Sequence, residues 1–151
     1  MLQLYAKRFE ELSNQELYRL LKLRVDVFVV EQHCPYPELD DRDQQALHVW
    51  LADEDGIAAC LRILPGGQHG AQATFGRVIA VRRRCGLGSR IVAEAIRLAQ
   101  EQFAAQTIYL EAQTYAVGLY EKQGFRRVGE EFLEDGIPHV GMLLTLPPVK
   151  A

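Results

Sequence analysis

The stretch from residue 75 to residue 99 constrains the fold more than any other part of the chain. Residues 75–81 (FGRVIAV) are apolar and rich in β-branched side chains, which favours a buried strand. After a basic turn with two glycines, the sequence changes to the spacing of an amphipathic helix. The apolar stripe of that helix consists of Ile91, Val92, Ala95, Ile96 and Ala99. The stretch therefore predicts a strand, a tight turn and a helix in immediate succession.

The turn itself, residues 82–89 (RRRCGLGS), predicts a binding site for a phosphate-bearing ligand, most naturally a pyrophosphate. A helix N-terminus has unpaired N–H groups and partial positive charge, and the arginines add full charges. The dinucleotide fingerprint is excluded, because Ile91 stands where its third glycine is needed. A Walker A loop is excluded, because no lysine follows Gly88. For the turn alone, an ordinary basic strand-to-helix connection with a glycine cap remains the alternative.

Size and charge narrow the class of protein. A chain of 151 residues predicts one domain, 1–151, with a full core, and 48% apolar residues exclude a disordered chain. No apolar run approaches the roughly 20 residues of a membrane helix, and no signal peptide is visible, so we expect a cytoplasmic protein that does not bind membranes. The net charge of −3 predicts no nucleic-acid partner. The three cysteines and four histidines lack metal-ligand spacing, so we expect no metal.

The remaining segments predict a meander followed by crossovers. Ser13 and Glu16 form a capping box at the start of a helix that we expect to run to about Val30. Residues 31–43 follow as a long, acidic, proline-containing loop. We expect strands at 2–9, 47–52, 57–64, 73–81, 107–112, from 125, and 139–146, with a hairpin turn at 53–56 and a short helix at 115–123. This order implies a mixed sheet with helices on both faces.

Two motifs carry a resemblance to a known family. The spacing of Arg83, Gly86 and Gly88 resembles the coenzyme A pyrophosphate loop of the GNAT superfamily of N-acetyltransferases. About 35 residues later, Tyr120 precedes the Gly124–Phe125 pair, as in the second motif of that family. Three further stretches, 27–36, 75–79 and 134–139, are similar to the ElaA-type subgroup of bacterial GNAT proteins, and the likeness covers essentially the whole chain.

The resemblance implies the GNAT acyl-CoA N-acyltransferase fold. This is an α/β (α+β) fold whose mixed, mostly antiparallel central sheet of about seven strands carries helices on both faces. It implies transfer of an acetyl group from acetyl-CoA to a primary amine of a small molecule or peptide by direct attack. The alternative is a non-catalytic acyl-CoA-binding or regulatory module on the same fold. A homodimer that pairs through the apolar final strand is left open.

The resemblance also implies the cofactor-binding residues. The pantetheine would lie beside the strand before the turn, paired with the backbone of Ile79 and Val81. The N–H of Ile79 or Ala80 would polarise the thioester carbonyl. The turn would hold the pyrophosphate. The full set of expected cofactor-binding residues is Ile79, Ala80, Val81, Arg83, Arg84, Cys85, Gly86, Leu87, Gly88, Ser89 and Gln113.

For catalysis, Tyr120 is the expected general acid, since the departing thiolate needs a proton. A base must take a proton from the attacking amine, and Glu111 and His139 are the main candidates. The loop 31–43 is expected to face the acceptor, and its acidity would attract a cationic amine. The acceptor-binding residues expected in it are Glu31, Gln32, His33, Tyr36 and Asp40.

Overall fold

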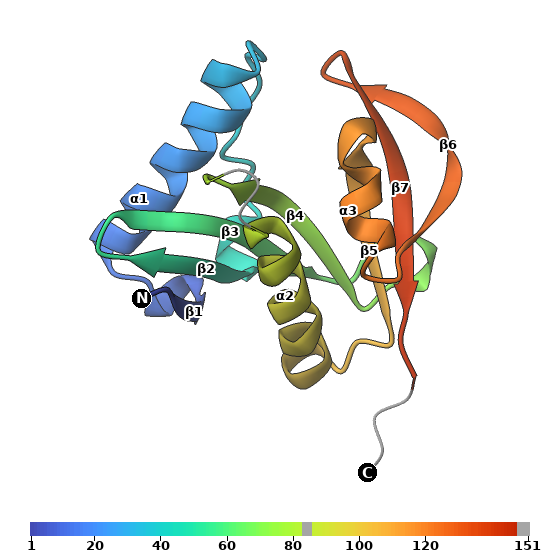
Figure 1. Cartoon of the computed structure of the whole chain (residues 1–151), viewed down its shortest axis with the longest axis horizontal. Helices are drawn as coiled ribbons and strands as arrows, with labels where there is room; N and C mark the ends of the chain where they lie inside the picture. The colour runs from blue at the N-terminus through green and yellow to red at the C-terminus, as the bar shows by residue number, and fades with distance from the viewer. Residues whose placement is uncertain (83–85, 148–151) are drawn as a thin grey trace.

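A seven-stranded mixed sheet runs through the computed structural model, which describes residues 1–82 and 86–147 (Figure 1). The strand order is β1-β2-β3-β4-β5-β7-β6, and every neighbouring pair is antiparallel except β4 and β5. The strands are β1 (Gln3–Arg8), β2 (Leu47–Asp53), β3 (Gly56–Pro65), β4 (Ala73–Ala80), β5 (Thr107–Gln113), β6 (Arg126–Glu134) and β7 (Ile137–Thr145). The helices are α1 (Asn14–Arg24), the π-helix η2 (Val25–Glu31), α2 (Leu87–Phe103) and α3 (Val117–Glu121). Single 3₁₀ turns are η1 (Phe9–Glu11), η3 (Asp43–Gln45), η4 (Gln68–Gly70) and η5 (Thr114–Ala116).

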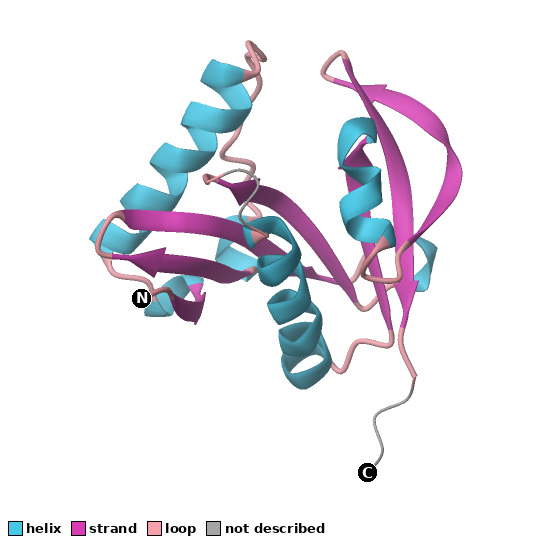
Figure 2. Cartoon of the chain, in the orientation of Figure 1, coloured by secondary structure: helices cyan, strands magenta, loops and turns pink. Residues whose placement is uncertain are grey.

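Helices cover both faces of the sheet, as the sequence predicts (Figure 2). On one face, α2 buries its predicted stripe, and the side chains of Ile91, Val92 and Ala95 are fully enclosed. Together with side chains of α3 and of the facing strands, such as Leu61 and Ile108, they form the larger hydrophobic core. On the other face, Leu20 of α1 packs with Trp50 and Cys60 of the sheet.

The predicted local signals are mostly confirmed. The Glu16 N–H donates to Ser13 Oγ at 3.0 Å, and the Glu16 carboxylate accepts from the Ser13 N–H at 2.9 Å, which forms the capping box. The hairpin turn lies between Asp53 and Gly56, with Gly56 at φ 107°. The first helix differs from the prediction, because α1 ends at Arg24 and continues as a π-helix. Side-chain spacing predicts a helical run, but it does not specify this wider hydrogen-bonding pattern.

The parallel strands β4 and β5 separate along their length. They pair only from Ala73 opposite Ile108 to Phe75 opposite Leu110. Beyond these residues β4 continues to Ala80 and β5 to Gln113 without a mutual ladder, and Figure 1 shows the two strands diverging. A bulge helps to turn β4 away, because Arg77 has φ 55° within the irregular register opposite Cys60 to Arg62. We call the opening between residues 76–80 and 111–113 the fork.

Candidate active site

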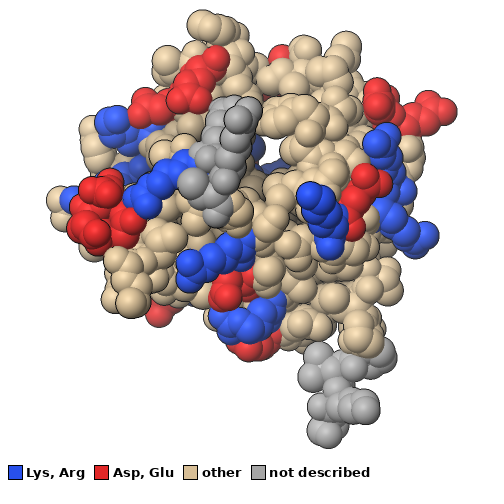
Figure 3. Space-filling model, viewed as in Figure 1, with Lys and Arg blue, Asp and Glu red and all other residues tan. Residues whose placement is uncertain are grey.

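A cleft of about 520 Å³ opens at the fork. Its walls come from the loop after η2, from β4 and β5, from α3 and from the β6–β7 hairpin. Figure 3 shows the molecule hollowed between the part that carries α2 and the part that carries α3. The structure brings seven of the predicted site residues to this cleft: Gln32, Tyr36, Asp40, Glu111, Gln113, Tyr120 and His139. Glu31 and His33 are exposed and do not line it.

Tyr120 reaches the cleft from α3, and only 6% of its surface is exposed. Its ring packs edge-on against Phe125, with 6.0 Å between the ring centroids. The hydroxyl makes no hydrogen bond to any residue that the structure describes. Burial raises the pKa of the phenol, with a smaller contribution from Tyr115. Tyr120 therefore holds its proton at neutral pH and can act as an acid but not as a base.

The backbone of β4 corrects two of the expected cofactor contacts. The Val81 N–H donates to the Ala58 carbonyl at 2.8 Å, so Val81 faces β3 rather than the fork. Backbone direction alternates along a strand, and Ile79, directly opposite Cys60, therefore also faces β3. The same alternation directs the C=O group of Val78 and both the N–H and the C=O group of Ala80 into the fork, whereas the bulge at Arg77 interrupts the alternation before the Val78 N–H. The apolar sequence pattern could not show which residues direct their backbone groups toward β3 and which toward the fork, because it reports side chains and not backbone direction.

The start of α2 presents backbone donors that lack partners within the helix. Gly86 caps the helix with φ 71°, and the first helical hydrogen bond runs from the Arg90 N–H to the Gly86 carbonyl at 3.0 Å. The N–H groups of Leu87, Gly88 and Ser89 therefore have no partner within the helix. Gly88 has a second role, because a Cβ there would lie 3.3 Å from Leu119 of α3.

The arginines of the turn are only partly described. Arg83, Arg84 and Cys85 lie outside the described residues. Arg82 forms an ion pair of 2.7 Å with Asp53 at the end of β2. This contact lowers the pKa of Asp53 and ties the turn to the β2–β3 hairpin.

The two candidate bases have different surroundings. Glu111 is exposed and directly follows Leu110, the last residue of β5 that pairs with β4. It accepts a hydrogen bond from the Tyr109 hydroxyl at 3.0 Å. His139 is buried and stacks on Phe132. Its Nδ1 lies 2.7 Å from the Ile137 carbonyl oxygen, which can only accept. In the neutral ring Nδ1 must therefore carry the proton, which leaves Nε2 as an acceptor.

Gln113 has a partner on the opposite wall of the cleft. Its side-chain amide and that of Gln32 exchange two hydrogen bonds of 3.3 Å each. The pair links the segment after η2 to the end of β5. Both amides also line the cleft, so a bound molecule can compete for their donors and acceptors.

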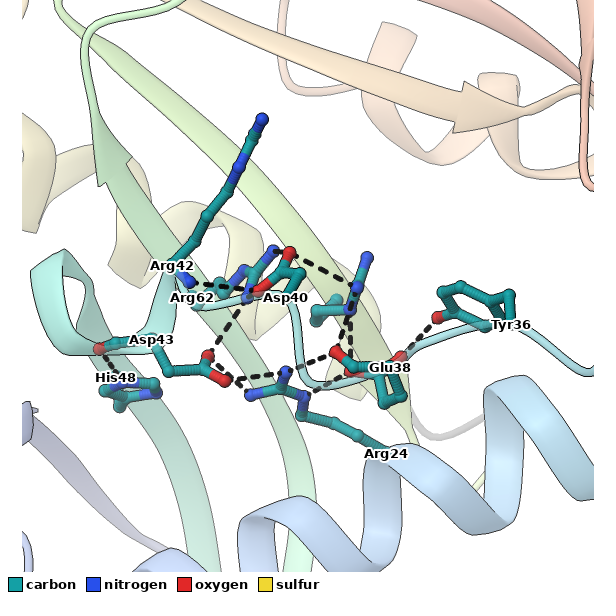
Figure 4. Close-up of polar contacts among 9 residues, drawn as sticks. Arg24, Tyr36, Glu38, Asp40, Arg42, Asp43, His48 and Arg62 are labelled. Atoms are coloured by element: carbon teal, nitrogen blue, oxygen red, sulfur yellow. Dashed lines mark hydrogen bonds and ion pairs between the residues drawn. The ribbon is translucent and has the colours of Figure 1, made fainter.

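Three of the five carboxylates in the acidic loop 31–43 are paired within the protein, which weakens the basis for the expectation that the charge of the loop attracts a cationic amine. Three of its carboxylates share three guanidinium groups from α1, β3 and β4 (Figure 4). Glu38 binds Arg24 Nε and Arg77 Nε, both at 2.7 Å, and Asp43 binds Arg24 Nη1 at 2.8 Å and Arg62 Nη1 at 3.0 Å. We call this the arginine–carboxylate network; its members are Arg24, Glu38, Asp40, Asp43, Arg62 and Arg77.

The network fixes the charge state of its carboxylates. Burial alone would raise the pKa of Asp40, but the hydrogen bond and charge of Arg62 outweigh it and hold that pKa well below its usual range. The pKa of Asp43 is lowered in the same way by Arg24 and Arg62. Tyr36 donates its hydroxyl to Glu38 and lies under the Arg77 guanidinium, so it is a supporting member of this wall. The pKa of Tyr36 is raised by burial and by Glu38.

The three arginines of the network were not singled out by the sequence analysis. A usable signal is present for Arg62 and Arg77, since each interrupts an apolar strand segment. A buried charge needs a partner, so an arginine inside an apolar strand predicts a carboxylate elsewhere in the chain.

Two features are absent from the described residues. No group of three or more His, Cys, Asp or Glu side chains is placed to hold a metal ion in that part of the chain. Over the same residues, no helix is both long and apolar enough to cross a membrane.

Comparisons with known proteins agree with one another. The Acetyltransferase (GNAT) domain family matches residues 11–146. A UPF0039 protein of Mycobacterium tuberculosis is 42% identical over 140 residues, which cover 89% of this chain and 87% of that protein. Protein ElaA of Escherichia coli is 36% identical over 136 residues, covering 87% of this chain and 89% of ElaA.

Solved structures of ElaA and of an acyl-CoA N-acyltransferase have a similar fold. The crystal structure of Escherichia coli ElaA has a TM-score of 0.88 at 33% identity and covers 95% of this chain and 99% of that one. An acyl-CoA N-acyltransferase from Pseudomonas aeruginosa has a TM-score of 0.87 at 36% identity, with coverage of 95% and 99%.

Proposed function

The chain belongs to the GNAT acetyltransferase family, and from that premise we propose that it transfers an acetyl group from acetyl-CoA to a primary amine by direct attack. The GNAT acyl-CoA N-acyltransferase fold predicted from the sequence is confirmed, as is the similarity to ElaA. The activity and the choice of acetyl-CoA among acyl-CoA molecules belong to the proposal.

One observation carries the proposal: the buried, protonated Tyr120 lines the cleft that opens at the fork. Val78 and Ala80 direct backbone groups into the same opening, where they would pair with the pantetheine. The N–H groups of Leu87, Gly88 and Ser89 would bind the pyrophosphate.

These groups account for each bond and each proton in the proposed acetyl transfer. The amine nitrogen attacks the thioester carbon while a β4 N–H, best supplied by Ala80, stabilises the developing oxyanion. The carbon–sulfur bond then breaks, and Tyr120 gives its proton to the departing thiolate. The proton lost by the amine passes to Glu111 or to His139 Nε2, directly or through water. No covalent acyl-enzyme is needed.

The first experiment is calorimetric titration with acetyl-CoA, with NAD and ATP as controls, followed by an assay of thiol release over a panel of amines. We expect saturable binding of acetyl-CoA alone and amine-dependent release of CoA. Binding without release for any amine would favour the non-catalytic acyl-CoA-binding module. Absence of binding would refute both.

A further inference from the structure

The cleft has walls of opposite charge. The wall formed by β5 and the β6–β7 hairpin carries the exposed carboxylates of Glu111, Glu134 and Asp135. The wall formed by the loop 31–43 and by β3 and β4 carries the guanidinium groups of Arg42, Arg62 and Arg77. Within the arginine–carboxylate network three cations and three anions balance, so any further cation on that wall gives it a net positive charge.

Arg42 is that further cation. It is exposed and lines the cleft, and its guanidinium makes no hydrogen bond or ion pair to a described residue. Its backbone N–H donates to Asp40 Oδ1 at 3.2 Å, which fixes the start of the side chain beside the network. Figure 4 shows the side chain extending away from the network rather than into it.

Arg62 supplies an independent indication of a ligand on the same wall. The residue is 4% exposed, and its Nη atoms bind Asp40 and Asp43, but its buried Nε has no hydrogen-bond partner in the described part of the chain. Buried donors in folded proteins are almost always paired. A Cβ built on Gly76 would lie 4.0 Å from this Nε, and apart from Gly76 and its two chain neighbours no residue places another heavy atom within 4 Å of that point. The side of the cleft toward Gly76 therefore has room for an acceptor atom beside the donor.

We propose that the acceptor is a zwitterion, an amino acid or a peptide with a free C-terminal carboxylate, whose carboxylate binds Arg42 and Arg62 Nε. This rests on the acetyltransferase activity proposed above. The amine end then points toward the carboxylates of the opposite wall, of which Glu111 lies at the fork. One surplus positive charge matches a monoanion, whereas a phosphate dianion would be repelled by Asp40. A cationic polyamine would leave both Arg42 and Arg62 Nε unpaired.

The test uses matched acceptor pairs, α-amino acids and dipeptides each compared with its own carboxamide, in the thiol-release assay. The carboxamide keeps the amine and the shape but loses the negative charge, and its less basic amine is more often neutral, so intrinsic reactivity favours it. We expect the acid to have a kcat/KM about 10- to 100-fold higher for the best pair, as a charge-assisted contact would give.

Variants locate the effect. Arg42→Ala should abolish the preference for the acid, and Arg42→Lys should retain part of it. Gly76→Ala should also reduce the preference for the acid, because its methyl group would occupy space beside Arg62 Nε without a steric clash. Arg126→Ala, which removes an exposed arginine of β6 that does not line the cleft, should change nothing. All four proteins should keep the melting temperature of the wild type.

A second readout does not need turnover. The melting temperature of the CoA-saturated protein should rise more with the acid than with its carboxamide, and this difference should vanish in Arg42→Ala. The inference would be overturned by any of three results: equal rises in melting temperature with the acid and its carboxamide, no rise with either, or a preference for the acid that persists in Arg42→Ala. If the carboxamides are acetylated as well as the matching acids are, the proposed carboxylate site is wrong, but the proposed acetyltransferase activity stands. If no amine releases CoA, the proposed function fails, and the melting experiment still decides whether the carboxylate binds.

Discussion

Tyr120 makes the proposed reaction testable at a single atom. Replacing Tyr120 with Phe should lower kcat about 100-fold or more, because the thiolate then leaves without a proton donor. The affinity for CoA and the melting temperature should stay near the wild-type values, since the ring is retained and the hydroxyl makes no hydrogen bond to a described residue. Steady-state kinetics, calorimetry and a melting curve check the three expectations. An unchanged kcat would assign the acid role to another group.

Gly86 is the second residue with a sharp expectation. Its φ of 71° lies in the left-handed region, where a β-branched side chain is strained. Gly86→Val should therefore distort the start of α2 and weaken CoA binding by at least tenfold. Gly118→Ala is the matched control, because Gly118 is exposed and a Cβ there meets nothing within 4 Å. Equal CoA affinities for the two variants would show that the turn does not hold the pyrophosphate.

Residue identity predicted the site better than residue charge did. Tyr120 could be placed from the spacing of its motif, Glu111 from its position at a strand end, and His139 from a stretch similar to the ElaA-type subgroup. All three line one cleft, and their roles stay predictions. The acidity of the loop was a weaker guide, because Arg62 and Arg77, which pair with its carboxylates, lie 19 to 39 residues away in the chain. Electrostatic pairing over such separations depends on the tertiary fold.

At the level of elements, β5 and β7 depend on a close approach at Gly141. A Cβ on Gly141 would lie 2.8 Å from the hydroxyl oxygen of Tyr109, well inside van der Waals contact. Gly141→Ala should displace the Tyr109 ring, break its hydrogen bond to Glu111 and reduce the free energy of unfolding by about 1–3 kcal/mol. Urea denaturation checks this value against Gly118→Ala. A variant as stable as the control would mean that the ring moves at no cost.

The order and type of the elements could be predicted from periodicity, capping and turn residues, but local departures from regular geometry could not. The π-helix η2 and the bulge at Arg77 are two such departures, and both lie next to the cleft. The left-handed φ of Arg77 is held by contacts from its side chain to Glu38 and Asp40. Contacts from a distant loop, not the preference of the arginine itself, therefore support that backbone conformation.

For the molecule as a whole, the arginine–carboxylate network predicts acid sensitivity. The folded-state pKa values of Asp40 and Asp43 lie below the ordinary value of 3.8, so the unfolded chain binds protons first as the pH falls. The free energy of unfolding should therefore be greatest above about pH 5 and decrease steadily as the pH falls toward the lowered pKa values. Urea denaturation between pH 7 and pH 3 measures this slope.

Asp43→Asn separates the network from other acidic groups. Removing one partner of a buried ion pair should lower the free energy of unfolding at pH 7 by about 3 kcal/mol. The variant should also show a shallower loss between pH 5 and pH 3, because one of the titrating carboxylates is absent. A variant with the same pH slope as the wild type would place the acid sensitivity elsewhere.

The fork also bears on how the protein avoids unwanted association. An unpaired strand edge on a surface recruits strands from other molecules and promotes aggregation. Here two such edges, residues 76–80 and 111–113, face one another inside the molecule. The outer edge strand β6 carries the charged side chains of Arg126, Arg127, Glu130 and Glu131, and its pairing with β7 is interrupted near Gly129, which has φ 75°. The fork thus turns two unpaired strand edges toward each other instead of toward neighbouring polypeptides, and the charges and interrupted pairing of β6 protect one of the two outer edges of the sheet.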